Sequence, residues 1–204
     1  MKIAFITPVT GNYYCGVCMR DNSLARNLID AGHEVTMLPT YLPHFLDEEP
    51  ASGDQPIFFG GINVYLQHKF SLFRHTPEWF DRALNAKWLL RKAAARSGMT
   101  SSKDLGEITL STFKGEDGPL VKEVQKVVDW FRKHEKPDVV FLSTILLAGL
   151  GRVVKRELNI PVYGFLQGED SFLDTLLDEY RTEAMNLLSV DVARLDGCIA
   201  PSRY

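Results

Sequence analysis

Residues 2–38 restrict the fold more than any other stretch of this sequence. Lys2–Thr7 is a short apolar run with β-branched and aromatic residues, which is typical of a strand buried on both faces of a parallel sheet. After a loop, apolar residues recur at helical spacing up to Gly32, which can end a helix in the left-handed conformation. Because Glu34–Leu38 predicts a second strand, the stretch predicts a β-α-β unit. The first loop of such a unit lies at the carboxyl edge of the sheet, where ligands with phosphates bind.

This first loop lacks the Gly-x-Gly-x-x-Gly pattern of dinucleotide-binding proteins. Gly16 would let a ligand approach the backbone, and Tyr13 and Tyr14 supply hydroxyl groups and stacking faces. Arg20, in the first turn of the expected helix, is a candidate anion contact because a cation is otherwise disfavoured there. These residues indicate a ligand other than a dinucleotide, with a simple turn at Gly16 and a solvated Arg20 as the alternatives.

Strands and helices alternate along the remainder of the chain. Apolar runs predict strands at 139–142, 161–166 and 197–200. Helical periodicity predicts helices at 101–113, 120–131 and 146–158, and a helical region up to 195 with a break near 178–181. The alternation predicts an α/β fold with a doubly wound, Rossmann-like parallel sheet and helices on both faces. We expect residues 1–204 to form a single domain of this kind.

Two segments near the middle of the chain depart from this alternation. Runs at 57–59 and 62–66 flank Gly60–Gly61 and predict a β-hairpin. Thr76–Glu78 has the pattern of a helix start, and Trp79 and Trp88 belong to the apolar stripe of that helix. Basic residues cover the rest of the helix. A solvated basic face is the favoured interpretation, and contact with a membrane surface is the alternative.

The composition limits the classes of function. The chain has 204 residues, of which 45% are hydrophobic and 24% charged, and this is ordinary for a globular protein. A formal net charge of −3 argues against bulk affinity for nucleic acid. The longest apolar run, 139–150, is too short to cross a bilayer. Three cysteines, an odd number, fit a reducing cytoplasm better than a disulfide framework.

Cys15 and Cys18 form a C-x-x-C pair at the start of the first expected helix. A helix dipole lowers the pKa of a nearby thiol, so a redox pair is chemically sensible. A metal site would need two further ligands, and neither Cys198 nor the five histidines have a spacing that supplies them. We favour two small buried residues that close the loop, with redox chemistry second and a metal site third.

Several phrases stand in a characteristic order: Met1–Phe5 with a loop ending in Gly16, Leu24–Val35, Lys136–Val140, Pro161–Asp170 and Asp196–Ser202. In this order they resemble the GT-B-fold glycosyltransferases of family 4, the group 1 glycosyl transferases. The resemblance covers nearly the whole chain. It implies an N-terminal, acceptor-side domain, and it implies a C-terminal donor domain that is absent from this sequence.

The resemblance also implies an activity. The full-length protein would transfer a sugar, with retention, from a sugar nucleotide to a sugar, lipid or small-molecule acceptor, and it would use no metal or other cofactor. The implied partners are the donor, the acceptor and the protein's own C-terminal domain, and nucleic acid is not among them. The cysteine content favours the cytoplasm, and the helix with Trp79 and Trp88 leaves peripheral contact at the inner membrane face as an alternative. One domain alone is expected to be inactive.

Polar residues at the carboxyl ends of two later strands complete the expected site. Ser143 and Thr144 follow one strand and Gln167–Asp170 follow the next, and parallel strands end at one edge of a sheet. Glu169 is expected to act as a general base or to accept a hydrogen bond from a sugar hydroxyl. Asp170 is expected to belong to the same catalytic site. The alternative is that Asp170 or Ser171 caps the next helix. Gly168 lets the backbone turn.

Two departures from the family pattern bear on this site. Many members have two adjacent glycines in the first loop, whereas this chain has Cys15–Gly16, so only Gly16 carries over. Many members have a histidine after the fifth strand, whereas Gln167 stands at that position here. Glutamine can hydrogen-bond a sugar hydroxyl but does not titrate near neutral pH.

Other functions remain open from the residues alone. A sugar-nucleotide epimerase shares the two-domain fold. A thiol redox protein would use Cys15 and Cys18, and a non-enzymatic binder of small ligands would need only one Rossmann-like domain.

Overall fold

The computed structural model of the protein describes residues 1–8, 16–42, 49–51, 53, 55–86, 88–90, 102–134 and 136–203. At its centre lies a five-stranded sheet with the order β2-β1-β3-β4-β5, in which every neighbouring pair is parallel. The strands are β1 (Lys2–Pro8), β2 (Glu34–Thr40), β3 (Val139–Leu142), β4 (Val162–Phe165) and β5 (Gly197–Ile199). The order and the parallel pairing confirm the predicted doubly wound, Rossmann-like α/β sheet.

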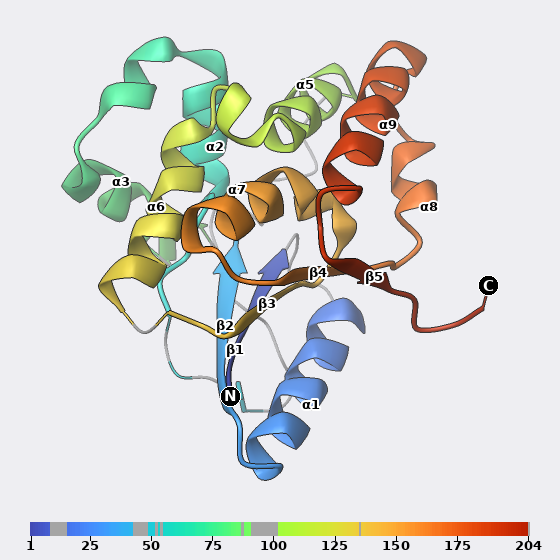
Figure 1. Ribbon diagram of the computed structural model, residues 1–204. Helices are drawn as coiled ribbons and strands as arrows, with labels where there is room; N and C mark the ends of the chain where they lie inside the picture. The colour runs from blue at the N-terminus through green and yellow to red at the C-terminus, as the bar shows by residue number, and fades with distance from the viewer. Residues whose placement is uncertain are drawn as a thin grey trace.

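The helices cover the two faces of this sheet unequally. They are α1 (Gly16–Asp30), α2 (Gly61–Lys69), α3 (Glu78–Leu84), α5 (Ser102–Phe113), α6 (Val121–Lys133), α7 (Ala148–Leu158), α8 (Glu169–Leu173) and α9 (Asp178–Val192). Figure 1 shows α1 on one side of the sheet, and α5, α6, α7 and α9 on the other. The larger hydrophobic core lies on the side of these four helices, and a smaller core lies under α1.

The end of α1 is set by the predicted glycine. Gly32 has a φ of +88°, and its N–H donates to the carbonyl of Ile29 at 2.8 Å. The N–H of His33 donates to the carbonyl of Leu28 at 3.0 Å. These two bonds form a Schellman motif, which stops the helix and turns the chain into β2.

The predicted β-hairpin across Gly60–Gly61 is wrong, because this segment forms the helix α2. The side chains of α2 that are buried are Asn63, Val64 and Gln67, which is a helical spacing. Two of the three are polar and find partners in the interior, since the Asn63 amide donates to Asn85 and the Gln67 amide to Glu123. A pattern search that places apolar residues inside cannot detect a helix whose inner face is polar.

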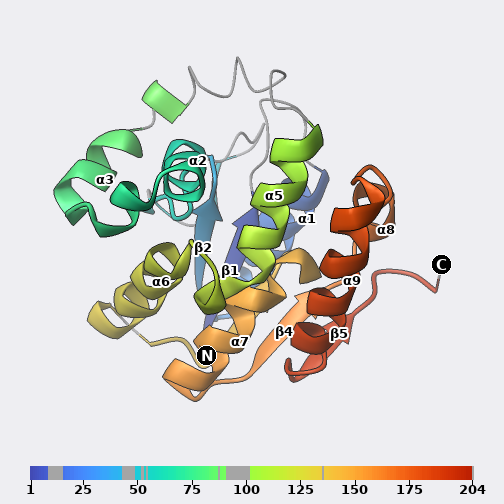
Figure 2. The same cartoon turned by 90° about the horizontal axis from the view of Figure 1, so that it is seen from above.

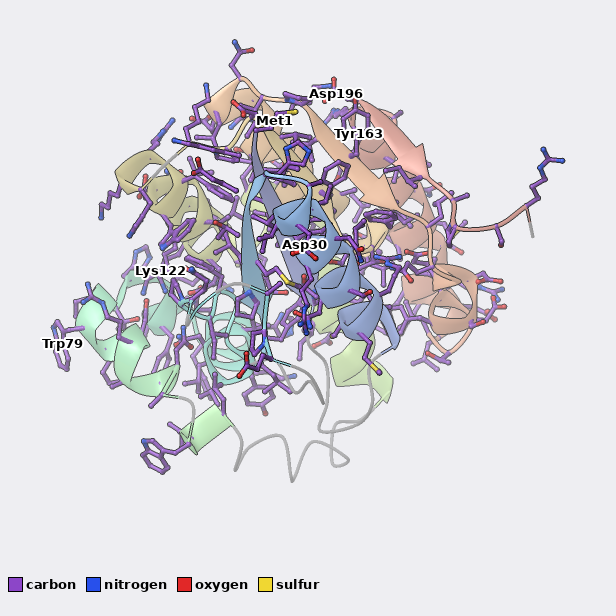
Figure 3. The ribbon with its side chains drawn as sticks, turned by 90° about the horizontal axis from the view of Figure 1, so that it is seen from below. Met1, Asp30, Trp79, Lys122, Tyr163 and Asp196 are labelled. Atoms are coloured by element: carbon purple, nitrogen blue, oxygen red, sulfur yellow. The ribbon has the colours of Figure 1, made fainter. Side chains whose placement is uncertain are left out.

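The helix predicted to start at Thr76–Glu78 is present as α3, but its apolar stripe does not face the core. Trp79 is 70% exposed, whereas Asp81 is only 2% exposed. The helix ends at Leu84, so Trp88, which is 69% exposed, lies beyond α3 and does not belong to its stripe as predicted. Trp79 points away from the body of the molecule in Figure 3. Asp81 turns inward because Lys122 and Lys126 of α6 bind its carboxylate, at 2.6 and 2.5 Å.

The helices α5 and α9 lie side by side, as Figure 2 shows from above. A Cβ atom at Gly106 would lie 2.4 Å from the Tyr180 ring, so this close approach needs glycine. The predicted helices at 101–113, 120–131 and 146–158 correspond to α5, α6 and the 3-10 turn Ile145–Leu147 followed by α7. The break predicted near 178–181 lies slightly earlier, between α8 and α9, and residues 178–181 form the first turn of α9.

Candidate functional site

Polar groups gather where the central strands end. Thr7 lies near the end of β1, Tyr41 follows β2, Ser143 and Thr144 follow β3, and Gln167 follows the short β4. The register of the parallel pairs brings these ends to one edge of the sheet. This edge is where open α/β sheets bind their ligands.

Glu169 occupies the centre of this edge and joins two loops. Its carboxylate accepts hydrogen bonds from the Thr144 hydroxyl at 2.5 Å, the Ile145 N–H at 3.3 Å and the Gln167 N–H at 2.6 Å. The residue is 8% exposed. A carboxylate has about four acceptor positions, so these three donors from the described residues leave room for one further hydrogen bond. Glu169 therefore holds the loops after β3 and β4 together and retains capacity for one ligand hydroxyl.

The residues beside Glu169 fix this arrangement. The Gln167 amide donates to the carbonyl of Ser143 at 2.6 Å. Gly168 has a φ of +79° and a ψ of 37° at the N-cap of α8, a conformation that disfavours any residue with a Cβ. No side-chain cap bond is made at the start of α8, so the alternative role of Asp170 as a capping residue finds no support. Asp170 itself is exposed.

Arg20 and Asp21 of α1 reach the same edge from the other face of the sheet. Asp21 is fully buried, and its carboxylate is bound by the Arg20 guanidinium. Burial raises the pKa of the Asp21 carboxyl, while its contacts with Ser143 and Arg20 act in the opposite direction. The Arg20 guanidinium also lies 4.1 Å from the centre of the Phe165 ring. Asp21 was not anticipated, because a single acidic residue in a helix gives no signal of burial.

We call Asp21, Ser143, Thr144, Gln167 and Glu169 the sheet-edge cluster. The Ser143 hydroxyl donates to the Thr7 hydroxyl at 3.0 Å, which ties β3 to β1. Ser143 has no exposed surface, and Thr144 is 6% exposed. Ser143 was expected to bind substrate, but it has no surface to offer a ligand and instead supports the residues of the site.

A hollow of about 470 Å³ opens beside the sheet-edge cluster. We call it the central hollow. Thr144, Gln167, Gly168 and Glu169 form one part of its wall. The other described lining residues come from α5, α8 and the turn before α7, and from Pro8 of β1, Val17 of α1 and Tyr41 after β2. Most of the other lining side chains are apolar, among them Val17, Ile108, Phe113, Leu146 and Phe172. The volume lies in the range of pockets that hold small molecules.

Tyr41 also lines the central hollow and was not anticipated. Its φ of +68° is unusual for a residue with a side chain. Its N–H donates to the carbonyl of Phe58 at 2.9 Å, and its carbonyl accepts from Gly61 at 3.1 Å. Burial raises the pKa of the Tyr41 phenol to about 12, against the effect of a hydrogen bond with Thr112. Backbone strain of this kind often accompanies binding sites, and the position directly after a strand end was the available signal.

The first loop contributes less to the described site than expected. Tyr13, Tyr14 and Cys15 lie outside the described residues. Gly16 is the exposed first residue of α1, and no described atom lies within 4 Å of a Cβ built on it. Cys18 is 1% exposed and packs with Leu42, Ile57 and Leu90.

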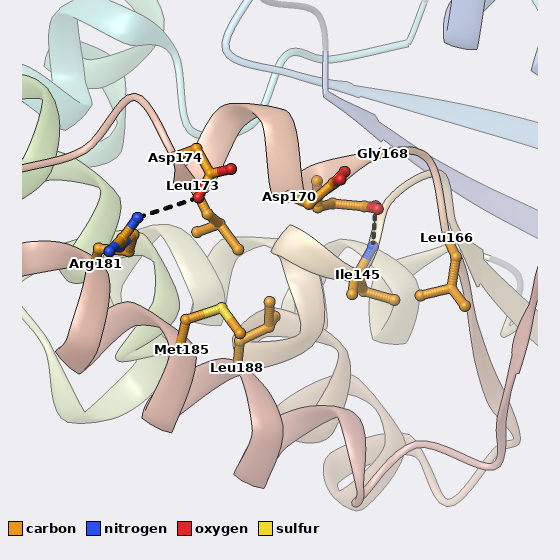
Figure 4. Close-up of a pocket in the computed structure, with 10 residues that line it drawn as sticks. Ile145, Leu166, Gly168, Asp170, Leu173, Asp174, Arg181, Met185 and Leu188 are labelled. Carbon is orange, nitrogen blue, oxygen red and sulfur yellow. Dashed lines mark hydrogen bonds and ion pairs between the residues drawn. The ribbon is translucent and has the colours of Figure 1, made fainter. Parts of the chain in front are cut away.

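A second hollow, of about 500 Å³, lies on the other side of α8 and is shown in Figure 4. Leu173, Met185 and Leu188 line it, and at its rim Arg181 binds Asp174 at 3.2 Å. Glu169, Gly168 and Asp170 border this hollow too. The start of α8 therefore separates two hollows, and Asp170 lines the second one only.

Within the described ranges, no three His, Cys, Asp or Glu side chains gather in a way that could hold a metal ion. In the same part of the chain, no helix is long and apolar enough to cross a membrane.

Comparisons with known proteins identify no family. No family model matches the chain, and no curated protein matches it. The crystal structure of the glycosyltransferase SnogD from Streptomyces nogalater aligns with the whole chain and with 46% of its own chain, at 14% identity and a TM-score of 0.39. The chain thus spans about half the length of that protein. A likeness at this level carries no argument about the function of this chain.

Proposed function

We propose that this chain is the acceptor-binding domain of a retaining glycosyltransferase that takes its sugar from a sugar nucleotide. The observation that supports this most is the position of the central hollow. It lies at the carboxyl edge of a parallel sheet, beside a carboxylate that has one free acceptor position. A second domain would close over this edge and hold the donor, as the sequence resemblance implies.

The residues of the edge have distinct roles in this proposal. Glu169 accepts a hydrogen bond from the acceptor hydroxyl and favours its attack. Gln167 holds the loop after β3 and hydrogen-bonds the transferred sugar, while Gly168 permits the turn. Asp170, which is exposed, lines the second hollow and has no part in the central one. Gly16 and Arg20, at the start of α1, lie nearest to the place where donor phosphate would meet the helix N-terminus.

The experiment compares sugar-nucleotide turnover by residues 1–204 with turnover by the protein from its whole reading frame. We expect transfer by the longer protein and none by residues 1–204, although the latter should fold. Holding donor and acceptor together supplies much of the rate, and one half of a cleft cannot do this. Transfer by residues 1–204, or a reading frame without a second domain, would contradict the proposal.

A thiol redox function gains no support from the described residues. Reactive thiols are partly exposed, whereas Cys18 is 1% exposed. If Cys15 and Cys18 only pack, replacing both with serine should leave transfer nearly unchanged. A sugar-nucleotide epimerase is the second candidate, and product analysis of the same turnover assay distinguishes it from a transferase.

Peripheral contact with a membrane is an additional proposal. Leu72, Trp79 and Trp88 are 75%, 70% and 69% exposed, and tryptophan favours the membrane interface. Co-sedimentation with vesicles containing phosphatidylglycerol tests the contact. We expect Trp79→Ala with Trp88→Ala to reduce the bound fraction, and Leu177→Ala, at an exposed apolar residue before α9, to leave it unchanged. Equal binding by the unchanged protein, the double tryptophan variant and Leu177→Ala would contradict a contact through these tryptophans.

A further inference from the structure

We propose that the central hollow binds a largely apolar molecule that carries a hydroxyl group. The assignment of this molecule as the acceptor, in place of a free sugar, rests on the proposed function. The binding itself rests on the side chains of the hollow.

The apolar part of the wall comes from separate elements that converge. Ile108 and Phe113 belong to α5, Leu146 to the turn before α7, and Phe172 to α8. A free sugar carries hydroxyl groups around its whole surface. Each of them would lose its hydrogen bonds to water against such a wall, at about 1–3 kcal/mol for each unpaired group. An apolar body instead gains free energy from the same contact.

Among the described lining residues, the polar side chains are Tyr41, Thr109, Thr112, Thr144, Gln167 and Glu169. Tyr41 and Thr112 hydrogen-bond each other, and Thr144 and Gln167 both donate to Glu169. Because most of these groups already have partners inside the protein, they can serve only one or two ligand hydroxyls. A hydroxyl beside Glu169 can use its remaining acceptor position, and the apolar body then lies against Leu146 and Phe172.

Hydrogen bonds hold two parts of the wall in place. Glu169 ties the loops after β3 and β4 together, and the strained backbone of Tyr41 is held by hydrogen bonds to Phe58 and Gly61. A wall built in this way needs little reorganisation on binding, which favours affinity.

The test uses 4-methylumbelliferone, a fused aromatic molecule with one hydroxyl, and methyl α-glucoside as the sugar probe. Isothermal titration measures the binding of each probe to the protein. We expect the aromatic probe to bind and the glucoside to bind at least about 10-fold more weakly, a difference of about 1.4 kcal/mol. Glucoside binding that equals or exceeds that of the aromatic probe would overturn the proposal.

Variants of the wall locate the binding. Leu146→Asn places an amide against the apolar body and should weaken probe binding about 10-fold. The matched control is Leu187→Asn, since Leu187 is also partly buried against the main core but does not line the hollow. If Leu146→Asn fails to fold, as judged by circular dichroism, Phe172→Ala takes its place. Probe binding that is unchanged in the folded wall variant, or weakened equally by Leu187→Asn, would overturn the proposal.

This result is independent of sugar transfer. Probe binding without turnover by the whole protein would refute the proposed function and leave the binding site established. Turnover on sugar acceptors without probe binding would support the proposed function and refute the proposed binding site.

Discussion

Two buried glutamates of this molecule each accept three hydrogen bonds, yet their surroundings differ in charge. Glu123 of α6 accepts from the Phe59 N–H, the Gln67 amide and the Lys126 ammonium, at 3.1, 2.8 and 2.6 Å. The three donors of Glu169 are neutral. Glu123 has no exposed surface, whereas Glu169 lines a hollow.

The group around Glu123, which we call the α6 cluster, consists of Gln67, Asp81, Lys122, Glu123 and Lys126. Lys126 binds both Glu123 and Asp81, and Lys122 also binds Asp81. Its carboxylates are thus balanced by two cations, and it fastens α2 and α3 to α6. The contrast indicates that the α6 cluster serves stability and that the sheet-edge cluster is the one prepared for a ligand.

The largest expected effect on stability is at Glu123. Glu123→Gln removes the charge that Lys126 pairs with in the interior, and breaking a buried pair lowers the free energy of unfolding by about 3 kcal/mol. Urea denaturation measures this change. A loss below about 1 kcal/mol would mean that Asp81 alone satisfies Lys126, and the α6 cluster would then be less important than we infer.

The matching change at the sheet edge should be milder. Glu169→Gln retains one oxygen acceptor and breaks no ion pair among the three hydrogen bonds described, so we expect a loss of about 1 kcal/mol in the free energy of unfolding. The same denaturation experiment measures it. A loss as large as that of Glu123→Gln would remove the distinction between the two clusters.

A substitution at Gly168 tests how strongly the turn at the sheet edge depends on its backbone conformation. Gly168→Ala forces a Cβ into the left-handed conformation and should lower the free energy of unfolding by about 1 kcal/mol. Gly16→Ala is the matched control, because no described atom crowds that position. Thermal melting of both variants checks the difference, and equal melting temperatures would show that the turn at Gly168 adapts.

The two regions should also differ in their response to pH. Burial acts to raise the pKa of the Asp81 carboxyl, but hydrogen bonds from Lys122, Lys126 and Thr76 outweigh it and hold the pKa below 3.8. Asp81 therefore stabilises the fold above this pH, and its contribution is lost as the pH falls through the lowered pKa. Asp21 has a raised pKa, so its contribution is present below pH 3.8 and is lost as the pH rises through the folded-state value.

Asparagine variants at the two positions measure this difference by urea denaturation near pH 3 and pH 7. Relative to the unchanged protein, Asp81→Asn should lose more stability at the higher pH. Asp21→Asn should lose less stability, or gain more, at the higher pH than at the lower one. If the stability loss of both variants changed with pH in the same direction, burial would not dominate the pKa of Asp21.

Much of the fold could be predicted from the sequence because buried parallel strands are continuous apolar runs. The strands at 2–7 and 139–142 and the cap at Gly32 follow from residue type alone. The helix α2 could not be predicted, because its buried side chains find partners that are distant in sequence. Asn63 donates to Asn85, just after α3, and Gln67 donates to Glu123 of α6. Local patterns carry no information about such partners.

The site was predictable only where the topology determines it. The positions of Ser143, Thr144 and Gln167–Asp170 follow from the rule that parallel strands end at one edge. The same rule applies to Tyr41, which directly follows the end of β2, although its residue type alone does not mark it as a site residue. The burial of Asp21 and the three donors of Glu169 depend on how loops and α1 pack, and only the structure supplies this.

The role of the sheet-edge cluster in the reaction is tested by comparing the two glutamates in catalysis. Turnover of a sugar nucleotide is measured with the protein from the whole reading frame, carrying either Glu169→Gln or Glu123→Gln, at a temperature at which both are folded. We expect a fall of about 10²-fold for Glu169→Gln, as for loss of an acid–base group, and nearly unchanged turnover for Glu123→Gln. Normal turnover with Glu169→Gln, or an equal fall in both variants, would contradict the assignment of the sheet-edge cluster to the reaction.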